Sequence, residues 1–240
     1  MDVAADGRAL VVREDFRQRV FYRSGETEPD RELSIHDCPR LFDLTRDGRM
    51  ISFWEYGEGV GKAGNQHFIR NTSGAPPVRL EVGRGGGPVF SQDGTSVAFA
   101  RWGPGALRVA VYPTGGGRPR EVRMPGFSRG FSGLLPDGAG IWLYDLSPDR
   151  PRRVWVTGAD GSNPRPVTPE GVEARYPWIA PDGRAVVGQS AGELRLYPIA
   201  GGDPVPLKGM RNGEVLAGWS DDGRSGFAYD PLRLPPALAR

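Results

Sequence analysis

Short apolar runs recur along the whole chain, and many of them are separated by the dipeptide Asp-Gly. In the segment from Tyr176 to Gly188, an aromatic and apolar run precedes Asp182-Gly183, and a valine-rich run follows it. Asp-Gly between two apolar runs is a strong local signal for a β-hairpin, since glycine tolerates the positive φ that such turns require. The pattern occurs six times, at Asp6-Gly7, Asp47-Gly48, Asp93-Gly94, Asp137-Gly138, Asp182-Gly183 and Asp222-Gly223.

The six predicted hairpins are evenly spaced, at intervals of 41, 46, 44, 45 and 40 residues. Three residues before each Asp there is an apolar side chain: Val3, Leu44, Phe90, Leu134, Ile179 or Trp219. Four residues after each Asp there is a second apolar residue, except at Gly226: Leu10, Ile51, Val97, Ile141 or Val186. Because alternate side chains of a strand face the same way, we expect these positions to form the buried sides of two paired strands.

Most repeats continue into a second strand–turn–strand unit, as in "LRVAVYPTGGGRPREV" and "ELRLYPIAGGDPVPL". Four short strands in a repeat of this length are typical of a β-propeller blade, and no segment has a convincing helical period. We therefore predict an all-β fold, a six-repeat β-propeller of four-stranded antiparallel blades with five nearly complete blades and a partial sixth. The chain would be a single domain, with approximate repeats 1–38, 39–84, 85–126, 127–172, 173–212 and 213–240.

The Asp of each pair could turn the chain or do chemistry. As a turn residue, its carboxylate would accept a hydrogen bond from the backbone N–H two residues on, while the glycine supplies a positive φ. The alternative is a ring of six carboxylates around a metal ion or a substrate. We expect each turn to lie far out on its own blade, and we therefore assign all six pairs a structural role.

Composition argues against several functional classes. Thirty-one Lys and Arg nearly balance 29 Asp and Glu, and the basic residues are scattered singly, so we do not expect a nucleic-acid partner. No apolar stretch is long enough to span a bilayer, and the N-terminus lacks the pattern of a secretory signal. Cys38 is the only cysteine, so no disulfide forms within the chain. Cysteine usage therefore does not distinguish an oxidising from a reducing compartment.

Three short motifs imitate catalytic or binding sites. Ser128 lies in a G-x-S-x-G sequence, but another predicted strand follows it where a nucleophile elbow needs a helix. The glycine-rich segment 57–65 lacks the first Gly and the final Ser or Thr of a phosphate-binding loop. His36 and Cys38 have no second ligand pair, as a zinc site would require. We expect no catalytic residue, no metal site and no cofactor.

The units "FSQDGTSVAF", "LLPDGAGIWL" and "WIAPDGRAVVG" resemble the TolB-like, WD-repeat-like β-propellers of bacteria. The core of that family is an aromatic residue, then Ser-Pro-Asp-Gly, then a short apolar strand. This chain keeps the proline at Pro136 and Pro181 and the serine at Ser91 and Ser220. More narrowly, the chain looks like the C-terminal sensor propeller of membrane-anchored signalling proteins. The resemblance implies a sensor or interaction role in a periplasmic or other extracytoplasmic location.

In a propeller of this topology, both turns within each blade lie on one face, and the more variable loops emerge on the other. Binding residues concentrate on variable loops held by a rigid scaffold, so we expect the binding site on that second face. Aromatic residues and Arg dominate protein–protein hot spots. The candidates are Trp54, Tyr56, Lys62, His67, Trp102, Phe127, Arg129, Arg175 and Tyr176. The alternative for each of them is packing between blades.

Three functions fit these observations. The preferred one is a non-catalytic propeller that binds a protein or peptide, with a small-molecule ligand as the second option. An accessory or gating propeller of a larger hydrolase is an alternative, although the chain contains no hydrolase domain. A propeller enzyme such as a lyase or glycosidase is less favoured, because the chain has two His and no paired carboxylates placed on inner strands. We therefore expect the chain not to be an enzyme.

Overall fold

The computed structural model describes residues 2–3, 9–10, 18–25, 27–36, 38–56, 65–136, 138–211, 214–220 and 224–229. Side chains are not described at 2–3, 9–10, 81–82, 176–178, 217 and 229. Several predicted residues lie outside this part of the chain: Asp6, Gly7, Lys62, Asp137, Asp222, Gly223 and the side chain of Tyr176.

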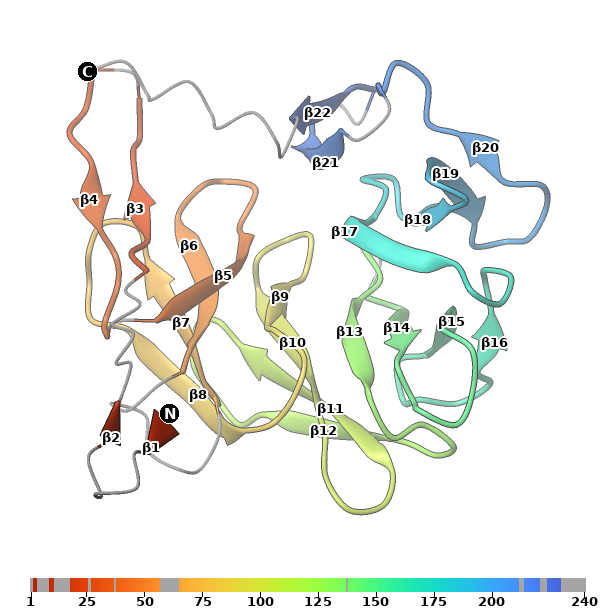
Figure 1. Ribbon diagram of the computed structural model, residues 1–240, viewed down its shortest axis with the longest axis horizontal. Coiled ribbons are helices and arrows are strands. Elements are labelled where there is room, and N and C mark those ends of the chain that lie inside the picture. Colours follow the sequence, from red (N-terminus) through yellow and green to blue (C-terminus); the bar gives the residue numbers. More distant parts are fainter. Residues whose placement is uncertain are drawn as a thin grey trace.

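Throughout the described residues the regular structure consists of strands, without a helix. Four sheets, each of four antiparallel strands, are arranged around a common centre (Figure 1). The first is β5 (Pro39–Leu44), β6 (Met50–Glu55), β7 (Asn65–Asn71) and β8 (Val78–Gly83). The second is β9 (Val89–Phe90), β10 (Ser96–Arg101), β11 (Leu107–Pro113) and β12 (Arg120–Met124). The third is β13 (Gly130–Leu134), β14 (Gly140–Asp145), β15 (Arg153–Gly158) and β16 (Arg165–Pro166). The fourth is β17 (Glu173–Ile179), β18 (Ala185–Ser190), β19 (Glu193–Pro198) and β20 (Val205–Pro206). The predicted propeller of antiparallel blades is confirmed.

The first and last repeats form two-stranded sheets. The pairs are β1 (Asp2–Val3) with β2 (Ala9–Leu10), β3 (Phe21–Tyr22) with β4 (Arg31–Glu32), and β21 (Val215–Trp219) with β22 (Gly226–Tyr229). The first repeat therefore has four strands divided between two separate pairs, and the last repeat has two. The pair β21–β22 contacts β17 and extends the ring beyond the fourth complete blade (Figure 1).

The Asp-Gly hairpins share one geometry. In the blade β5–β8, the N–H of Gly48 donates to the carbonyl of Thr45 (2.8 Å), and the N–H of Thr45 donates to the carbonyl of Met50 (2.9 Å). The loop therefore has four residues, two more than in the tightest hairpins. Asp47 Oδ1 accepts a hydrogen bond from the N–H of Arg49 (3.0 Å), two residues on, while Gly48 has a φ of 68°. The same bonds recur in the next blade around Asp93 and in the fourth around Asp182.

The second turn of each of two blades is bonded to the Asp-Gly turn of the same blade. Between β7 and β8, the N–H of Thr72 donates to the carbonyl of Arg49 (2.8 Å), and its hydroxyl donates to that of Gly48 (2.8 Å). In the next blade, Thr114 makes the equivalent backbone bond to Thr95 (2.9 Å). Both turns of a blade therefore lie on the same face of the ring, as the strand topology requires.

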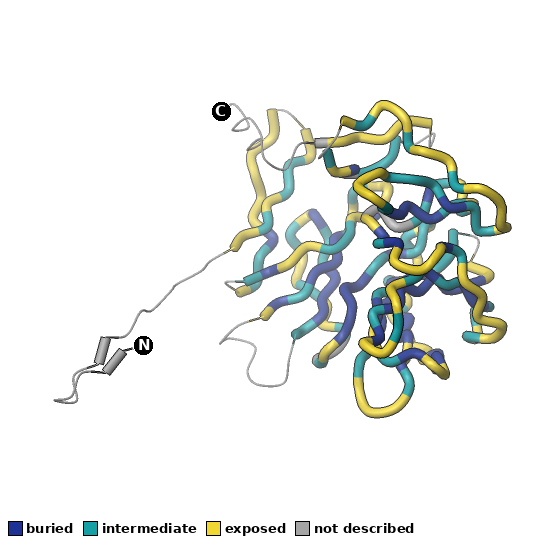
Figure 2. Tube along the Cα trace, turned by 45° about the vertical axis from the view of Figure 1, so that its right-hand side comes forward, coloured by how far each residue is buried: buried dark blue, intermediate teal, exposed yellow. Residues whose placement is uncertain are grey.

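The core lies within and between the blades, and exposed residues concentrate on the turns (Figure 2). The side chains of four of the apolar residues that follow an Asp by four positions are described, and all four are buried: Ile51, Val97, Ile141 and Val186. Each pairs directly with the apolar residue three positions before that Asp or its equivalent. Burial was predicted for both sets, but the prediction is wrong for Leu44, which is 45% exposed. Leu44 and Phe90 both line a cavity at the centre of the ring, but Phe90 also packs against Ile69 and Val97, whereas Leu44 belongs to none of the hydrophobic clusters of the described residues.

We expect Gly183→Ala to destabilise the protein more than Gly138→Ala. Both glycines have a positive φ (70° and 67°), which costs an L-residue about 1 kcal/mol. A Cβ on Gly183 would also lie 3.0 Å from Pro136 of the neighbouring blade, whereas a Cβ on Gly138 would meet nothing within 4 Å. The crowding should add about 1 kcal/mol to the loss for Gly183→Ala.

Urea unfolding of the two variants and the parent chain measures both differences. Equal losses would contradict the contact with Pro136, and no loss in either variant would contradict the turn geometry itself.

Candidate functional site

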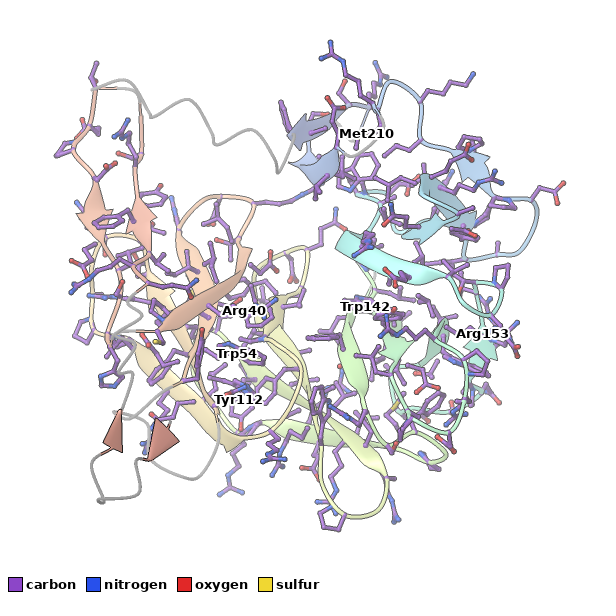
Figure 3. All side chains as sticks on the ribbon, in the orientation of Figure 1. Arg40, Trp54, Tyr112, Trp142, Arg153 and Met210 are labelled. Atoms are coloured by element: carbon purple, nitrogen blue, oxygen red, sulfur yellow. The ribbon has the colours of Figure 1, made fainter. Side chains whose placement is uncertain are left out.

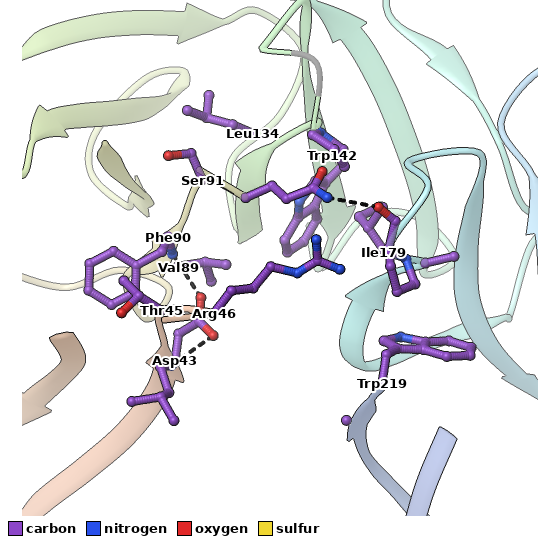
Figure 4. A pocket seen from close by; sticks show the side chains of 16 residues that line it. Asp43, Thr45, Arg46, Val89, Phe90, Ser91, Leu134, Trp142, Ile179 and Trp219 are labelled. Atoms are coloured by element: carbon purple, nitrogen blue, oxygen red, sulfur yellow. Dashed lines mark hydrogen bonds between the residues drawn. The ribbon is translucent and has the colours of Figure 1, made fainter. Parts of the chain in front are cut away.

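A cavity of about 350 Å³ opens at the centre of the ring, on the face that carries the Asp-Gly turns (Figure 4). Each of the four complete blades contributes the end of its first strand and the start of the turn that follows, and the pair β21–β22 contributes Gly218 and Trp219. The first strand of each blade is therefore the innermost. The walls are mainly apolar and aromatic, as in small-ligand sites of other proteins.

Arg46 is the most prominent charged group of this cavity. It occupies the turn position immediately before Asp47, and its side chain extends across the cavity toward the side where Ile179 and Trp219 lie (Figure 4). The residue is exposed, and its guanidinium forms no ion pair or hydrogen bond with any residue that the structure describes. A guanidinium carries five N–H donors in a planar fork, so this one remains available to a ligand.

The other polar groups of the cavity are largely engaged in holding the ring together. Asp43 Oδ2 accepts a hydrogen bond from the N–H of Phe90 in the next blade (2.8 Å), and its Oδ1 accepts one from Leu44 (2.9 Å). Gln92 Nε2 donates to the carbonyl of Pro181 (3.0 Å), which links the second complete blade to the fourth (Figure 4). These bonds fix the wall from which Arg46 projects.

The Asp-Gly turns lie around this central cavity, and the expectation that they lie far out on their blades is wrong. The reason is that each turn follows an innermost strand. Their carboxylates are nevertheless occupied: the Thr45 hydroxyl and the Arg49 N–H lower the pKa of Asp47, and the Ser91 hydroxyl and the Thr95 N–H lower that of Asp93. Each carboxylate thus accepts hydrogen bonds from its own turn.

The sequence candidates Trp54 and His67 lie together on β6 and β7. Their rings are stacked with centroids 5.9 Å apart, and the His67 ring also meets Phe99 of the next blade edge-on at 4.4 Å. His67 is 1% exposed. The Arg40 guanidinium, from β5, lies over the Trp54 ring at 5.9 Å from its centroid (Figure 3). The structure thus places both candidates at the contact between two blades.

Trp102 and Arg129 form a second cluster, between the next two blades. The indole N–H of Trp102 donates to the carbonyl of Gly130 (2.8 Å), and the Arg129 guanidinium lies 4.7 Å from the Trp102 ring. Phe127 is 5% exposed and packs edge-on against Trp155 at 5.4 Å. Of these three candidates, only Arg129 is exposed.

Two glycines separate the two aromatic clusters. A Cβ on Gly87 would lie 1.9 Å from the Phe42 ring, and a Cβ on Gly86 would lie 2.9 Å from the Phe131 ring. Side chains are therefore excluded at both positions, because the rings of the two flanking blades fill that space.

The other two candidates with described side chains, Arg175 and Tyr56, do not join either cluster. Arg175 is paired with Glu173 (2.6 Å) and Gln189 (2.7 Å) on the fourth complete blade, and Tyr56 is 40% exposed at the end of β6. The seven candidates with described side chains thus form two inter-blade clusters and isolated surface positions, and the role of all nine in binding stays a prediction.

Sequence reasoning missed the central cavity and its residues Arg46, Gln92, Trp142 and Trp219. One signal could have found part of this set. The residue immediately before each Asp follows an innermost strand and therefore lies beside the cavity. In the first two complete blades this residue is Arg46 and Gln92.

Comparison with known proteins establishes the fold class. No protein-family model matches the chain, and no curated protein does. Among solved structures, a TolB from Agrobacterium tumefaciens is 16% identical with a TM-score of 0.64, over 95% of this chain and 87% of that one. TolB from Acinetobacter baumannii is 15% identical with a TM-score of 0.55, over 79% of this chain and 50% of that one. The propeller domain of the Trilobed protease from Pyrococcus furiosus is 12% identical with a TM-score of 0.55, over 82% of this chain and 69% of that one. The chain therefore has the TolB-like β-propeller fold that its repeats indicated.

Burial of His67 should make the stability of the ring depend on pH. Burial lowers the pKa of His67 from 6.5 to about 4, so the folded protein holds this ring neutral. As the pH falls below 6.5, the unfolded chain binds a proton that the folded protein excludes. The free energy of unfolding should therefore fall between pH 6.5 and pH 4, by up to about 3 kcal/mol.

Replacing His67 by Phe should remove this part of the pH dependence, whereas replacing the exposed His36 by Gln should leave it unchanged. Urea unfolding at pH 7 and pH 4.5 measures the change for each variant. If the free energy of unfolding falls by the same amount from pH 7 to pH 4.5 in the parent chain and in His67→Phe, burial of His67 is not the cause of the pH dependence.

Proposed function

We propose that this chain is a non-catalytic β-propeller that binds a protein or peptide partner, and that the partner inserts a short segment into the central cavity. The observation that carries the proposal is the Arg46 guanidinium, which extends without a partner among the described residues across a cavity lined by Phe90, Trp142 and Trp219. Arg and Trp are the residue types that contribute most at interface hot spots.

The architecture suits this role. Residues from four blades and from β21 meet at the cavity, and the hydrogen bonds from Phe90 to Asp43 and from Gln92 to Pro181 cross between blades. A site built from such cross-linked strands is preorganised, and preorganisation lowers the entropic cost of binding. The likeness to TolB propellers supports an interaction role, and an extracytoplasmic location rests on the family resemblance alone.

Two other functions have less support from these observations: a propeller enzyme, and a gating propeller of a larger hydrolase. Within the described residues, no three His, Cys, Asp or Glu side chains are grouped as the ligands of a metal ion would be. The similarity to the propeller domain of the Trilobed protease keeps a gating propeller of a larger hydrolase as the alternative.

The partner should be lost when the charge of Arg46 is reversed. The immobilised chain is exposed separately to envelope and cytosolic extracts of the source cell, and the captured proteins are identified by mass spectrometry. We expect a specific protein that the parent chain and Arg129→Glu retain and that Arg46→Glu loses. Because Arg46 contacts no described polar group, its variant should melt at the parent temperature.

Loss on Arg129→Glu with retention on Arg46→Glu would move the binding site to the opposite face of the ring. No specific protein from either extract, with the parent chain folded, would contradict a protein partner.

A further inference from the structure

The charged donor of the central cavity is Arg46, whose guanidinium N–H groups have no partner among the described residues. Asp43 accepts from two backbone N–H groups, and the hydroxyls of Thr45 and Ser91 each accept one within their turns. The indole Nε1 of Trp219 is buried and has no surface open to the cavity. A ligand that supplies acceptors to Arg46 gains a charged hydrogen bond.

The cavity holds one negative and one positive side chain, Asp43 and Arg46. The carboxylate of Asp43 is held by the two backbone N–H groups that it binds. The Arg46 side chain carries its guanidinium away from Asp43, toward Ile179 and Trp219 (Figure 4). The guanidinium therefore presents its positive charge to the side of the cavity away from Asp43, where it favours an anion.

The size and walls of the cavity decide which anion fits. One guanidinium suits the two oxygens of a carboxylate, which an Arg fork binds in a bidentate manner. A phosphate would leave further charged oxygens against Leu134, Trp142 and Ile179, which line the same cavity and offer them no charge. These apolar walls, in a volume of about 350 Å³, accommodate a hydrocarbon side chain instead.

We infer that the group recognised in the cavity is a carboxylate that lies next to an apolar side chain, with Arg46 as its partner. The inference rests on the function proposed above and specifies its ligand. Such a group is found at the C-terminus of a peptide that ends in an apolar residue, or at an Asp or Glu side chain beside an apolar residue within a peptide.

Three capped dipeptides distinguish these cases in isothermal titration calorimetry with the full chain. The first is acetyl-Ala-Phe with a free carboxylate, the second is its C-terminal amide, and the third is acetyl-Glu-Phe amide. We expect the free acid to bind and the plain amide to bind at least about tenfold more weakly, because a charged hydrogen-bonded contact is lost. Binding of the Glu peptide as tightly as the acid would identify a side-chain carboxylate as an equal source.

The variants Arg46→Met and Arg49→Met test the assignment to one residue. Arg49 is a matched control, since it lies in the same turn, is exposed and is paired with Asp47 instead of lining the cavity. Arg46→Met should abolish the preference for the acid, and Arg49→Met should keep it. If neither carboxylate peptide bound more tightly than the plain amide, if neither bound at millimolar concentration, or if the preference were unchanged in Arg46→Met, the inference would be overturned.

The two proposals can fail separately. If the protein partner is lost on Arg46→Glu while the dipeptides show no preference for the acid, the proposed binding site is supported and the proposed carboxylate ligand is wrong. If the acid binds through Arg46 while no protein is captured, recognition of a carboxylate is supported and the ligand is a small molecule instead of a protein.

Discussion

The strand register, the core and the central cavity all depend on the turn between the first and second strands of each blade. At Asp47, Asp93 and Asp182 the carboxylate accepts the N–H two residues on, and the following glycine takes a positive φ that other residues adopt only under strain. This turn sets the register of the two innermost strands. The register in turn buries Ile51, Val97, Ile141 and Val186 within the core. It also places the residue before each Asp at the mouth of the central cavity, which is how Arg46 reaches its position.

The sequence predicts the repeating architecture well because turn chemistry and strand alternation are local properties. It does not predict the cavity, because no local pattern reveals which strand of a blade is nearest the axis. Arg46 and Trp219 are far apart in the chain and meet only when the ring forms. For the same reason the exposure of Leu44 could not be predicted. Its spacing from Asp47 matches that of Phe90 from Asp93, and both line the cavity, but only Phe90 also packs against Ile69 and Val97.

The aromatic residues of the two clusters illustrate a second limit. Composition marks Trp54, His67 and Trp102 as candidates for binding, and in the ring they lie between blades. A propeller has few other ways to join its sheets, because no backbone ladder crosses from one complete blade to the next. Stacked rings, guanidiniums over aromatic faces and glycines where rings approach closely supply these contacts. Aromatic content alone therefore does not separate a binding surface from an inter-blade seam.

The central claim is that the cavity at the Asp-Gly face binds a carboxylate through Arg46. A crystal structure of the chain with acetyl-Ala-Phe tests it most directly. The account predicts the ligand in the cavity, with its carboxylate oxygens within hydrogen-bond distance of the Arg46 guanidinium and its phenyl ring against the apolar wall. A ligand bound at the Trp54 or Trp102 cluster, or one bound in the cavity with its carboxylate turned away from Arg46, would contradict it.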